Sequence, residues 1–111
     1  MQSGMRREIA NPMERRIIQS LLDVVILLEL RKRSLSGYDV QTLVLEEFRR
    51  VISTGTIYAR LYALERQELI KGEFRFRRRV YVLTQRGEEA AKELSRSKNR
   101  IMLTVMKLFT R

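Results

Sequence analysis

Hydrophobic positions recur at helical spacing over the first third of the chain. Residues 12–31, PMERRIIQSLLDVVILLELR, are apolar at intervals of three and four, and additional apolar positions widen the stripe beyond one face. Asn11 can cap this helix, with Pro12 at its first position and Glu14 three residues after the cap. We therefore expect a helix over residues 12–31 that is either central to the core or shared with a second subunit.

A second, shorter helix is predicted after Ser36, which is a suitable N-cap residue. Its apolar residues again recur at intervals of three and four. The positions expected to face inward are Val40, Leu43, Val44 and Phe48.

A third helix is predicted over about residues 53–67, capped by Ser53. Ile57, Leu61 and Leu64 form its buried row. The core of the unit is then expected to contain Ile17, Leu21, Leu43, Ile57, Leu61 and Leu64. The side expected to face outward carries Thr56, Ala59, Arg60, Ala63 and Gln67.

The period changes to two from Leu69 onward, where LIKGEFRFRRRVYVLT alternates apolar and charged residues. This alternation predicts a β-hairpin, with its projecting part over residues 72–83. The tip is expected within residues 77–79, which contain none of the Gly, Asn or Asp residues that tight turns prefer, so the turn type stays open.

A long last helix is predicted over residues 85–109, capped by Thr84. Its apolar positions, with Lys98 included, are spaced 3-4-3-4-3 like a coiled-coil seam, and the polar stretch 95–100 marks a place for a bend or fraying. So much apolar surface exceeds what a small monomer buries, which predicts a homodimer. The residues expected at the dimer interface are Ile18, Leu22, Val25, Leu94, Ile101, Met102, Val105, Leu108 and Phe109.

Composition narrows the classes of function. The 23 Lys and Arg residues against 13 Asp and Glu residues give a formal charge of +10 and a sequence pI near 10.8, which favours a polyanionic partner, nucleic acid before a membrane surface. The chain has no Cys and no His, so thiolate and imidazole chemistry is excluded, and no metal, cofactor or catalytic residue is expected.

The chain shows no sign of export or membrane insertion. Its most apolar run, residues 21–30, contains Asp23 and Glu29 and is far shorter than the roughly 20 residues of a membrane span. The first residues lack the apolar segment of a secretory signal. We expect a cytoplasmic, nucleoid-associated protein.

The order of three helices, a hairpin and a long helix predicts a mainly α fold with a small β-hairpin, namely a winged helix-turn-helix with a C-terminal dimerisation helix. Residues 1–84 would form the DNA-binding domain, with residues 1–10 flexible or in an extra short helix, and residues 85–111 would add the dimerisation helix to the same compact unit. In such a fold the third helix enters the major groove of double-stranded DNA. The arginine-rich hairpin grips the flanking backbone or minor groove.

Three motifs make this interpretation specific. They are a Gly-Tyr-Asp opening of the second helix at 37–39, a Gly-Thr-x-Tyr-x-x-Leu-x-x-Leu-Glu pattern at 55–65, and a Tyr-x-Leu-Thr-x-x-Gly exit from the hairpin at 81–87. In this order and spacing, over residues 25–94, they resemble the PadR family of winged-helix transcriptional regulators. The resemblance implies a homodimeric DNA-binding repressor of the subgroup with a short C-terminal helix, dimerised through its last helix.

The chain departs from the family pattern at several positions. Glu68 stands where a helix-ending Gly is common, so the end of the third helix requires another solution. Some relatives bind flat hydrophobic drugs between tryptophans at the dimer interface, and this chain has no Trp, which argues against a pocket of that kind. A small-molecule effector is left open.

The stretch Ser53-Thr54-Gly55-Thr56 has three possible interpretations. A nucleotide-binding P-loop would need a longer Gly-rich loop ending in Lys-Ser/Thr, which is missing. Capping of the third helix accounts for Ser53, and the free amides there can also hold a DNA phosphate. For Arg60, contact with a base competes with contact with phosphate or solvent. The candidate DNA-binding residues are Ser36, Tyr38, Ser53, Thr54, Gly55, Thr56, Tyr58, Arg60, Arg75, Arg77, Arg78 and Arg79.

Two functions remain after these exclusions. The first is a sequence-specific transcriptional regulator, expected to be a repressor. The second is an architectural protein that coats DNA without sequence preference, which the charge of +10 alone would support. An enzyme is disfavoured because no paired acids stand in a plausible cleft, and RNA binding is disfavoured because exposed aromatic residues on a sheet are lacking.

Overall fold

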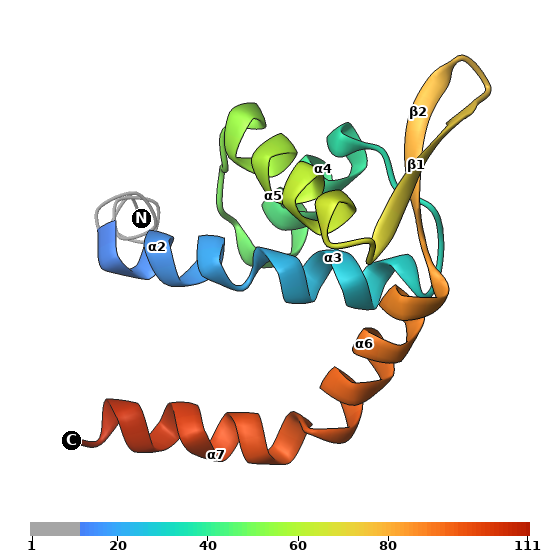
Figure 1. Ribbon diagram of the computed structural model, residues 1–111. Coiled ribbons are helices and arrows are strands. Elements are labelled where there is room, and N and C mark those ends of the chain that lie inside the picture. Colours follow the sequence, from blue (N-terminus) through green and yellow to red (C-terminus); the bar gives the residue numbers. More distant parts are fainter. Residues whose placement is uncertain (1–11) are drawn as a thin grey trace.

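The computed structural model describes residues 12–111, so the expected cap Asn11 and the first ten residues lie outside the described part. The predicted class is confirmed, because the described chain is mostly helical with one antiparallel hairpin (Figure 1). The elements are α2 (Pro12–Ser20), α3 (Leu22–Leu30), α4 (Gly37–Phe48), α5 (Thr54–Arg66), β1 (Ile70–Arg75), β2 (Arg78–Leu83), α6 (Gln85–Arg96) and α7 (Lys98–Phe109).

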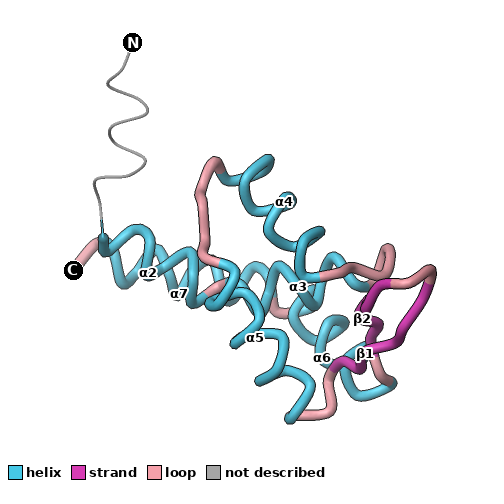
Figure 2. Tube along the Cα trace, turned by 90° about the horizontal axis from the view of Figure 1, so that it is seen from above, coloured by secondary structure: helices cyan, strands magenta, loops and turns pink. Residues whose placement is uncertain are grey.

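The elements lie on two sides of α2 and α3. Helices α4 and α5 and the hairpin lie on one side, and α6 leads to α7 on the other (Figure 1). Seen from above, α2 lies at one end of the molecule and the hairpin at the opposite end (Figure 2). The hairpin and α5 are therefore presented on one face, and the C-terminal helix faces the other way.

The core lies between α3, α4, α5 and the hairpin. The buried cluster consists of Leu22, Ile26, Leu27, Leu30, Leu35, Val40, Val44, Ile52, Ile57, Leu61, Leu64, Ile70 and Tyr81. The expected core positions Ile17 and Leu21 were wrong, because they are 40% and 48% exposed, and Phe48 is 39% exposed. Helix α2 has no buried residue, and α3 is apolar on all sides, so the periodicity of this stretch did not reveal which face turns inward.

The expected single helix over residues 12–31 is two helices that meet at Leu21. The amide of Leu21 is shared between the carbonyls of Ile17 and Ile18, each at 3.1 Å. The hydroxyl of Ser20 donates to the same Ile17 carbonyl at 2.7 Å. This competition for backbone acceptors is a known cause of helix bending.

Three predicted N-caps are confirmed. The hydroxyl of Ser36 accepts from the amide of Asp39 at 3.0 Å, and the amide of Ser36 donates to the Asp39 carboxylate at 2.9 Å, which completes a capping box. Ser53 accepts from the amide of Thr56 at 3.1 Å, and Thr84 accepts from the amide of Gly87 at 3.0 Å. The side chains that start α4, α5 and α6 were thus readable from residue type and spacing.

The hairpin forms as predicted, but its tip lies one residue earlier than expected. Arg75 pairs with Arg78, so the turn consists of Phe76 and Arg77, with φ values of 51° and 66°. Two central residues at positive φ are the signature of a type I′ turn, whose twist matches that of the strands. The base of the hairpin is fastened to Leu35, which exchanges backbone hydrogen bonds with Tyr81 at 2.7 and 3.2 Å.

The last helix bends within the predicted polar stretch, at Ser97, which separates α6 from α7. Helix α6 packs on α3, and its Ala90 and Leu94 lie against the core, whereas α7 has no buried residue. Figure 1 shows α7 extending back below α3 and α2. Within the described residues, no helix is long and apolar enough to cross a membrane.

The end of α5 shows how the chain manages without the usual glycine. Glu68 adopts a φ of 63°, its amide donates to the Glu65 carbonyl at 2.9 Å, and the amide of Leu69 donates to the Leu64 carbonyl at 3.0 Å. These two bonds form a Schellman motif with Glu in the left-handed position. The carbonyl of Glu68 is held as well, because it accepts a hydrogen bond from the Thr84 hydroxyl at 2.6 Å.

Replacing Glu68 by Gly should therefore stabilise the fold. Removing the Cβ from a left-handed residue relieves about 1 kcal/mol of steric strain. Urea unfolding at a fixed protein concentration should show Glu68→Gly with a midpoint above wild type and Glu68→Ala without that gain. An equal gain for Glu68→Ala would assign the effect to loss of the carboxylate instead of to backbone geometry.

Candidate nucleic-acid interface

The exposed face of α5 is made by a different row of residues than expected. Gly55, Ala59, Tyr62 and Arg66 are exposed and recur at intervals of four, three and four. They lie opposite the buried row of Ile57, Leu61 and Leu64. The expected outward side was rotated by about a quarter turn, and of its members only Ala59 and Gln67 are fully exposed. We refer to Gly55, Ala59, Tyr62 and Arg66 as the outward row of α5.

Arg60 is turned toward α3 instead of outward. Its Nε and Nη2 atoms donate to the two carboxylate oxygens of Asp23 at 2.9 and 2.7 Å. The hydrogen bonds and the charge of Asp23 raise the pKa of Arg60. This fork-to-fork contact fixes the guanidinium plane and ties α5 to α3. Within the protein alone, Arg60 is thus an inter-helix contact, contrary to its predicted outward position.

The start of α5 combines exposed and engaged groups. Ser53, Thr54 and Gly55 are exposed, and the side chain of Ser53 satisfies the amide of Thr56. The Ser53 hydroxyl also contacts the Thr56 hydroxyl at 2.9 Å, and Thr56 is half-buried. The first turn of the helix is therefore accessible to a ligand, but the side chain of Thr56 is partly occupied.

The candidate tyrosines and Ser36 separate into buried and exposed groups. Tyr58 packs against Gly37, where an added Cβ would lie 2.4 Å from the tyrosine ring, and its ring centroid is 5.8 Å from that of Tyr62. Tyr38 is 71% exposed. Ser36 is 7% exposed and its hydroxyl serves the capping box.

Three of the four hairpin arginines are paired with acids, two of them with acids of the neighbouring helices. Arg79 donates to Glu65 of α5 at 2.9 Å, and its guanidinium lies 5.4 Å from the centre of the Tyr81 ring. Burial raises the pKa of Tyr81, although the hydrogen bond from Arg79 opposes the shift. Arg75 pairs with Glu73 of its own strand. In the described part of the chain, Arg77 at the tip has no ion pair.

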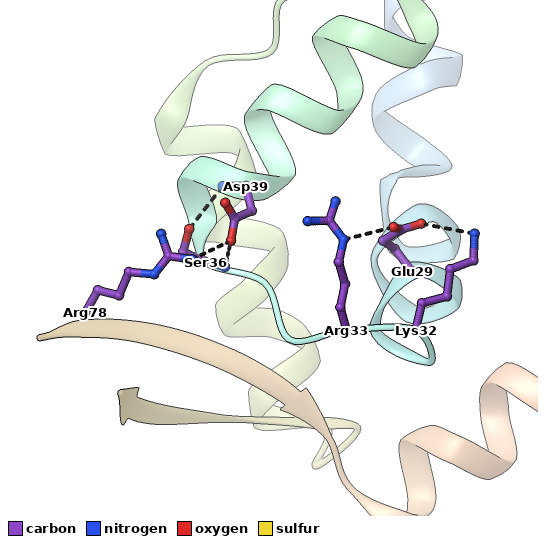
Figure 3. Close-up of polar contacts among 6 residues, drawn as sticks. All are labelled: Glu29, Lys32, Arg33, Ser36, Asp39 and Arg78. Carbon is purple, nitrogen blue, oxygen red and sulfur yellow. Dashed lines mark hydrogen bonds and ion pairs between the residues drawn. The ribbon is translucent and has the colours of Figure 1, made fainter. Parts of the chain in front are cut away.

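Asp39 connects the hairpin to α4. Its carboxylate accepts from the Ser36 amide and from Arg78 at 3.0 Å (Figure 3). Burial alone would raise the pKa of Asp39, but the hydrogen bonds from Ser36 and the charge of Arg78 outweigh it and lower the pKa. The Arg78–Asp39 pair therefore orients the hairpin relative to α4 by charge, in addition to the backbone pairing at its base. Glu29, also drawn in Figure 3, holds Arg33 at 3.1 Å and Lys32 at 3.6 Å.

A groove on the opposite side of the molecule collects most of the predicted dimer residues. It is lined by Ile18, Leu21, Val24, Val25, Leu28, Phe48, Leu94, Ser95, Lys98, Ile101, Met102 and Val105. Leu108 and Phe109 lie exposed farther along α7. Leu22 was wrongly assigned to this surface, because it is 0% exposed and belongs to the core of the same chain. We call this surface the α3–α7 groove.

Sequence reasoning missed Asp23, Tyr62 and Arg66. The buried row of α5 was correctly identified. On a helix of 3.6 residues per turn, the positions opposite that row include Tyr62 and Arg66, so the periodicity could have placed them on the outward face. Nothing in the sequence indicated that Asp23 would meet Arg60, 37 positions away. No group of three or more acidic residues that could hold a metal ion occurs among residues 12–111.

The fold and this surface define a winged helix-turn-helix protein. Residues 26–93 match the Transcriptional regulator PadR-like family, and the chain belongs to that family. The members are transcriptional regulators and not enzymes. A comparison with curated proteins returns no match.

Solved structures of PadR proteins resemble this chain. A PadR-like transcriptional regulator of Bacillus cereus is 25% identical, with a TM-score of 0.71, and the alignment covers 86% of this chain and 98% of that one. Bacillus subtilis PadR in complex with operator DNA is 28% identical, with a TM-score of 0.59, over 66% of this chain and 46% of that one. The structure of Bacillus subtilis PadR in complex with p-coumaric acid is 28% identical, with a TM-score of 0.57, and the alignment covers 68% of this chain and 41% of that one.

The role of Asp39 can be tested through pH. Because its folded pKa lies below the ordinary 3.8, its stabilising effect should be complete above that value and lost as pH falls through the folded pKa. At neutral pH, Asp39→Asn should lower the free energy of unfolding by about 1 kcal/mol, as loss of a capping interaction does.

Urea unfolding over a pH series provides the measurement. The difference between wild type and Asp39→Asn should begin to shrink as pH falls below the ordinary 3.8 and should be lost as pH passes through the lowered folded pKa of Asp39. Glu46→Gln, at an exposed position of the same helix, is the matched control and should change stability little. A difference that stays constant down to the lowest pH would contradict the assigned contacts.

Proposed function

We propose that this chain is a sequence-specific regulator that binds double-stranded DNA as a homodimer, with α5 in the major groove. The observation that carries the proposal is the joint presentation of the outward row of α5 and the hairpin on one face of a PadR-family chain. Gly55 and Ala59 are small enough to let the helix approach the bases, and Tyr62 and Arg66 supply donors. The Bacillus subtilis relative solved in complex with operator DNA supports DNA binding by this chain.

Phosphate contacts would come from the elements that flank the outward row. The exposed first turn of α5 offers amides at Ser53, Thr54 and Gly55, where the helix dipole favours an anion. The hairpin adds exposed arginines, which we place on the flanking backbone or minor groove. The net charge of +10 supports affinity for any duplex, so the order of bases must be distinguished by the outward row.

The proposed dimer forms through the α3–α7 groove. Seven apolar residues of α7 are between 40% and 72% exposed in the single chain, and the groove beside them is itself apolar. A second copy of α7 has the complementary apolar surface, and a twofold axis would bury both copies at once. The partner side is opposite the DNA side, so dimerisation leaves both copies of α5 and the hairpin free (Figure 1).

We propose repression as the mode of action, because a dimer that occupies a promoter excludes the polymerase from it. The competing function is an architectural protein that coats DNA, which the charge favours. Selection of duplexes from a random library at about 0.15 M salt decides between the two. Recovery of a twofold-symmetric sequence with half-sites about 34 Å apart supports regulation. Recovery of unrelated sequences would contradict sequence-specific regulation. In-vitro transcription from the selected site then tests repression.

Arg66 and Arg77 should contribute differently to binding. Arg66→Ala should cost about 1–3 kcal/mol on the selected duplex and relax the preference at one position, because a base contact is lost. Arg77→Ala should weaken all sequences alike and reduce the salt slope by about 1, as expected for a phosphate contact. Fluorescence anisotropy on matched and mismatched duplexes at several salt concentrations gives both quantities.

Arg96 is the control for charge alone, since it is exposed and is the last residue of α6, which lies on the other side of α3 from α5 (Figure 1). Arg96→Ala should leave the preference among sequences intact. If Arg66→Ala lowered binding equally on all sequences, the assignment of the outward row to base reading would fail.

Val105→Glu should convert the dimer into monomers. Val105 lines the α3–α7 groove and is 40% exposed, so a carboxylate there would be buried without a partner on dimerisation. Thr104→Glu adds the same charge on the same helix outside the groove and should leave the dimer intact. Sedimentation measures the mass of each variant, and a Val105→Glu variant that stays dimeric would refute the proposed interface.

A further inference from the structure

The hairpin ends in an aromatic ring that the fold does not use. Phe76 is the first of the two turn residues and is 94% exposed, the highest value among the exposed large hydrophobic residues of the described chain. Phe74, two residues earlier on β1, is 75% exposed, so the expectation that the sheet lacks exposed aromatic residues was wrong. Figure 1 shows the tip of this hairpin projecting beyond α4 and α5. The ring therefore contributes no packing to the core.

The backbone at this tip is unfavourable for the residues that occupy it. A type I′ turn requires two residues at positive φ, which Asn-Gly adopts most readily. Here Phe76 and Arg77 have φ values of 51° and 66°. A bulky residue in this region is strained, and such strain gathers at functional sites. Hairpin stability alone would select other residues, which indicates that the side chains are retained for another purpose.

Arginines adjoin Phe76 along the hairpin, although Arg75 is paired with Glu73 and Arg78 with Asp39. Arg77 follows Phe76 in the turn, and the cross-strand pair Arg75 and Arg78 flanks the turn on both strands. Arg77 carries a charge that no acid among the described residues neutralises. An apolar ring followed by the unpaired charge of Arg77 matches the minor groove, where arginines meet concentrated negative potential and apolar side chains insert between base steps.

We propose that Phe76 is a wedge that stacks on a base step in the minor groove, while the adjacent Arg77 holds a phosphate. This inference rests on the proposed function, because it requires α5 to place the hairpin over duplex DNA. The wedge would favour flexible pyrimidine–purine steps, which unstack most easily. It therefore adds a preference at positions that α5 does not reach and bends the duplex toward the major groove.

The absence of Trp from the chain makes the test direct. In the Phe76→Trp variant the only indole lies at the wing tip. Adding the selected duplex should quench its fluorescence and protect it from acrylamide, because a stacked indole is shielded by bases. The matched variant Phe74→Trp has its indole on the strand behind the tip and should stay accessible. A Phe76→Trp signal that remains as accessible as in the free protein would overturn the wedge.

Substitutions that remove the ring separate stacking from turn geometry. Phe76→Ala and Phe76→Asn should each weaken binding about tenfold, the scale of one lost base–aromatic stack. Asn suits the left-handed turn better than Phe, so the hairpin of Phe76→Asn should be at least as well formed. Full affinity in Phe76→Asn would show that the ring is not needed.

The outcomes distinguish this inference from the proposed function. A gel shift with the selected duplex but no change in the Phe76→Trp signal defeats the wedge and leaves DNA binding standing. A mixed-sequence duplex at low salt is used if selection returns no preferred site, because the wedge does not depend on base reading by α5. Failure to shift any duplex overturns both. A blue shift with phosphatidylglycerol vesicles and none with duplex would overturn the wedge in favour of membrane insertion.

Discussion

The packing of α5 on α3 is the constraint on which the surface depends. The buried row of α5, Ile57, Leu61 and Leu64, belongs to the same core cluster as Leu22 and Ile26 of α3. Each buried branched side chain contributes about 1.5–3 kcal/mol to the stability of the fold. This packing sets the rotation of α5 about its own axis, and hence which residues lie on the outside. The Arg60–Asp23 pair then fixes the same two helices at the edge of the contact.

The hairpin depends on the same frame through different forces. Backbone bonds to Leu35 hold its base, and the pairs Arg78–Asp39 and Arg79–Glu65 join it to the start of α4 and to α5. Asp39 serves both the cap of α4 and the wing, so helix start and hairpin orientation are coupled through one carboxylate. In a chain with so many arginines, these internal acids also decide which cations remain available to a partner.

The two proposed functions, DNA binding and dimerisation, lie on opposite sides of the molecule. Helix α3 is apolar around its circumference, and the structure resolves this by burying Leu22, Ile26 and Leu30 on one face and turning Val24 and Val25 into the α3–α7 groove on another. Because the groove and α7 face away from α5, a second copy can bind there without covering the proposed DNA surface. The bend at Ser97 produces this separation by directing α7 back along α2 and α3.

Local features were decided by the sequence alone. The caps Ser36, Ser53 and Thr84, the hairpin and the bend near Ser97 follow from residue type and spacing, because they involve residues close together in the chain. Tertiary structure decided which arginine pairs with which acid, which face of an all-apolar helix is buried, and that Glu68 and Phe76 adopt left-handed backbones. Those outcomes depend on residues far apart in sequence and on packing that overrides local preference, as the partnership of Arg60 with Asp23 shows.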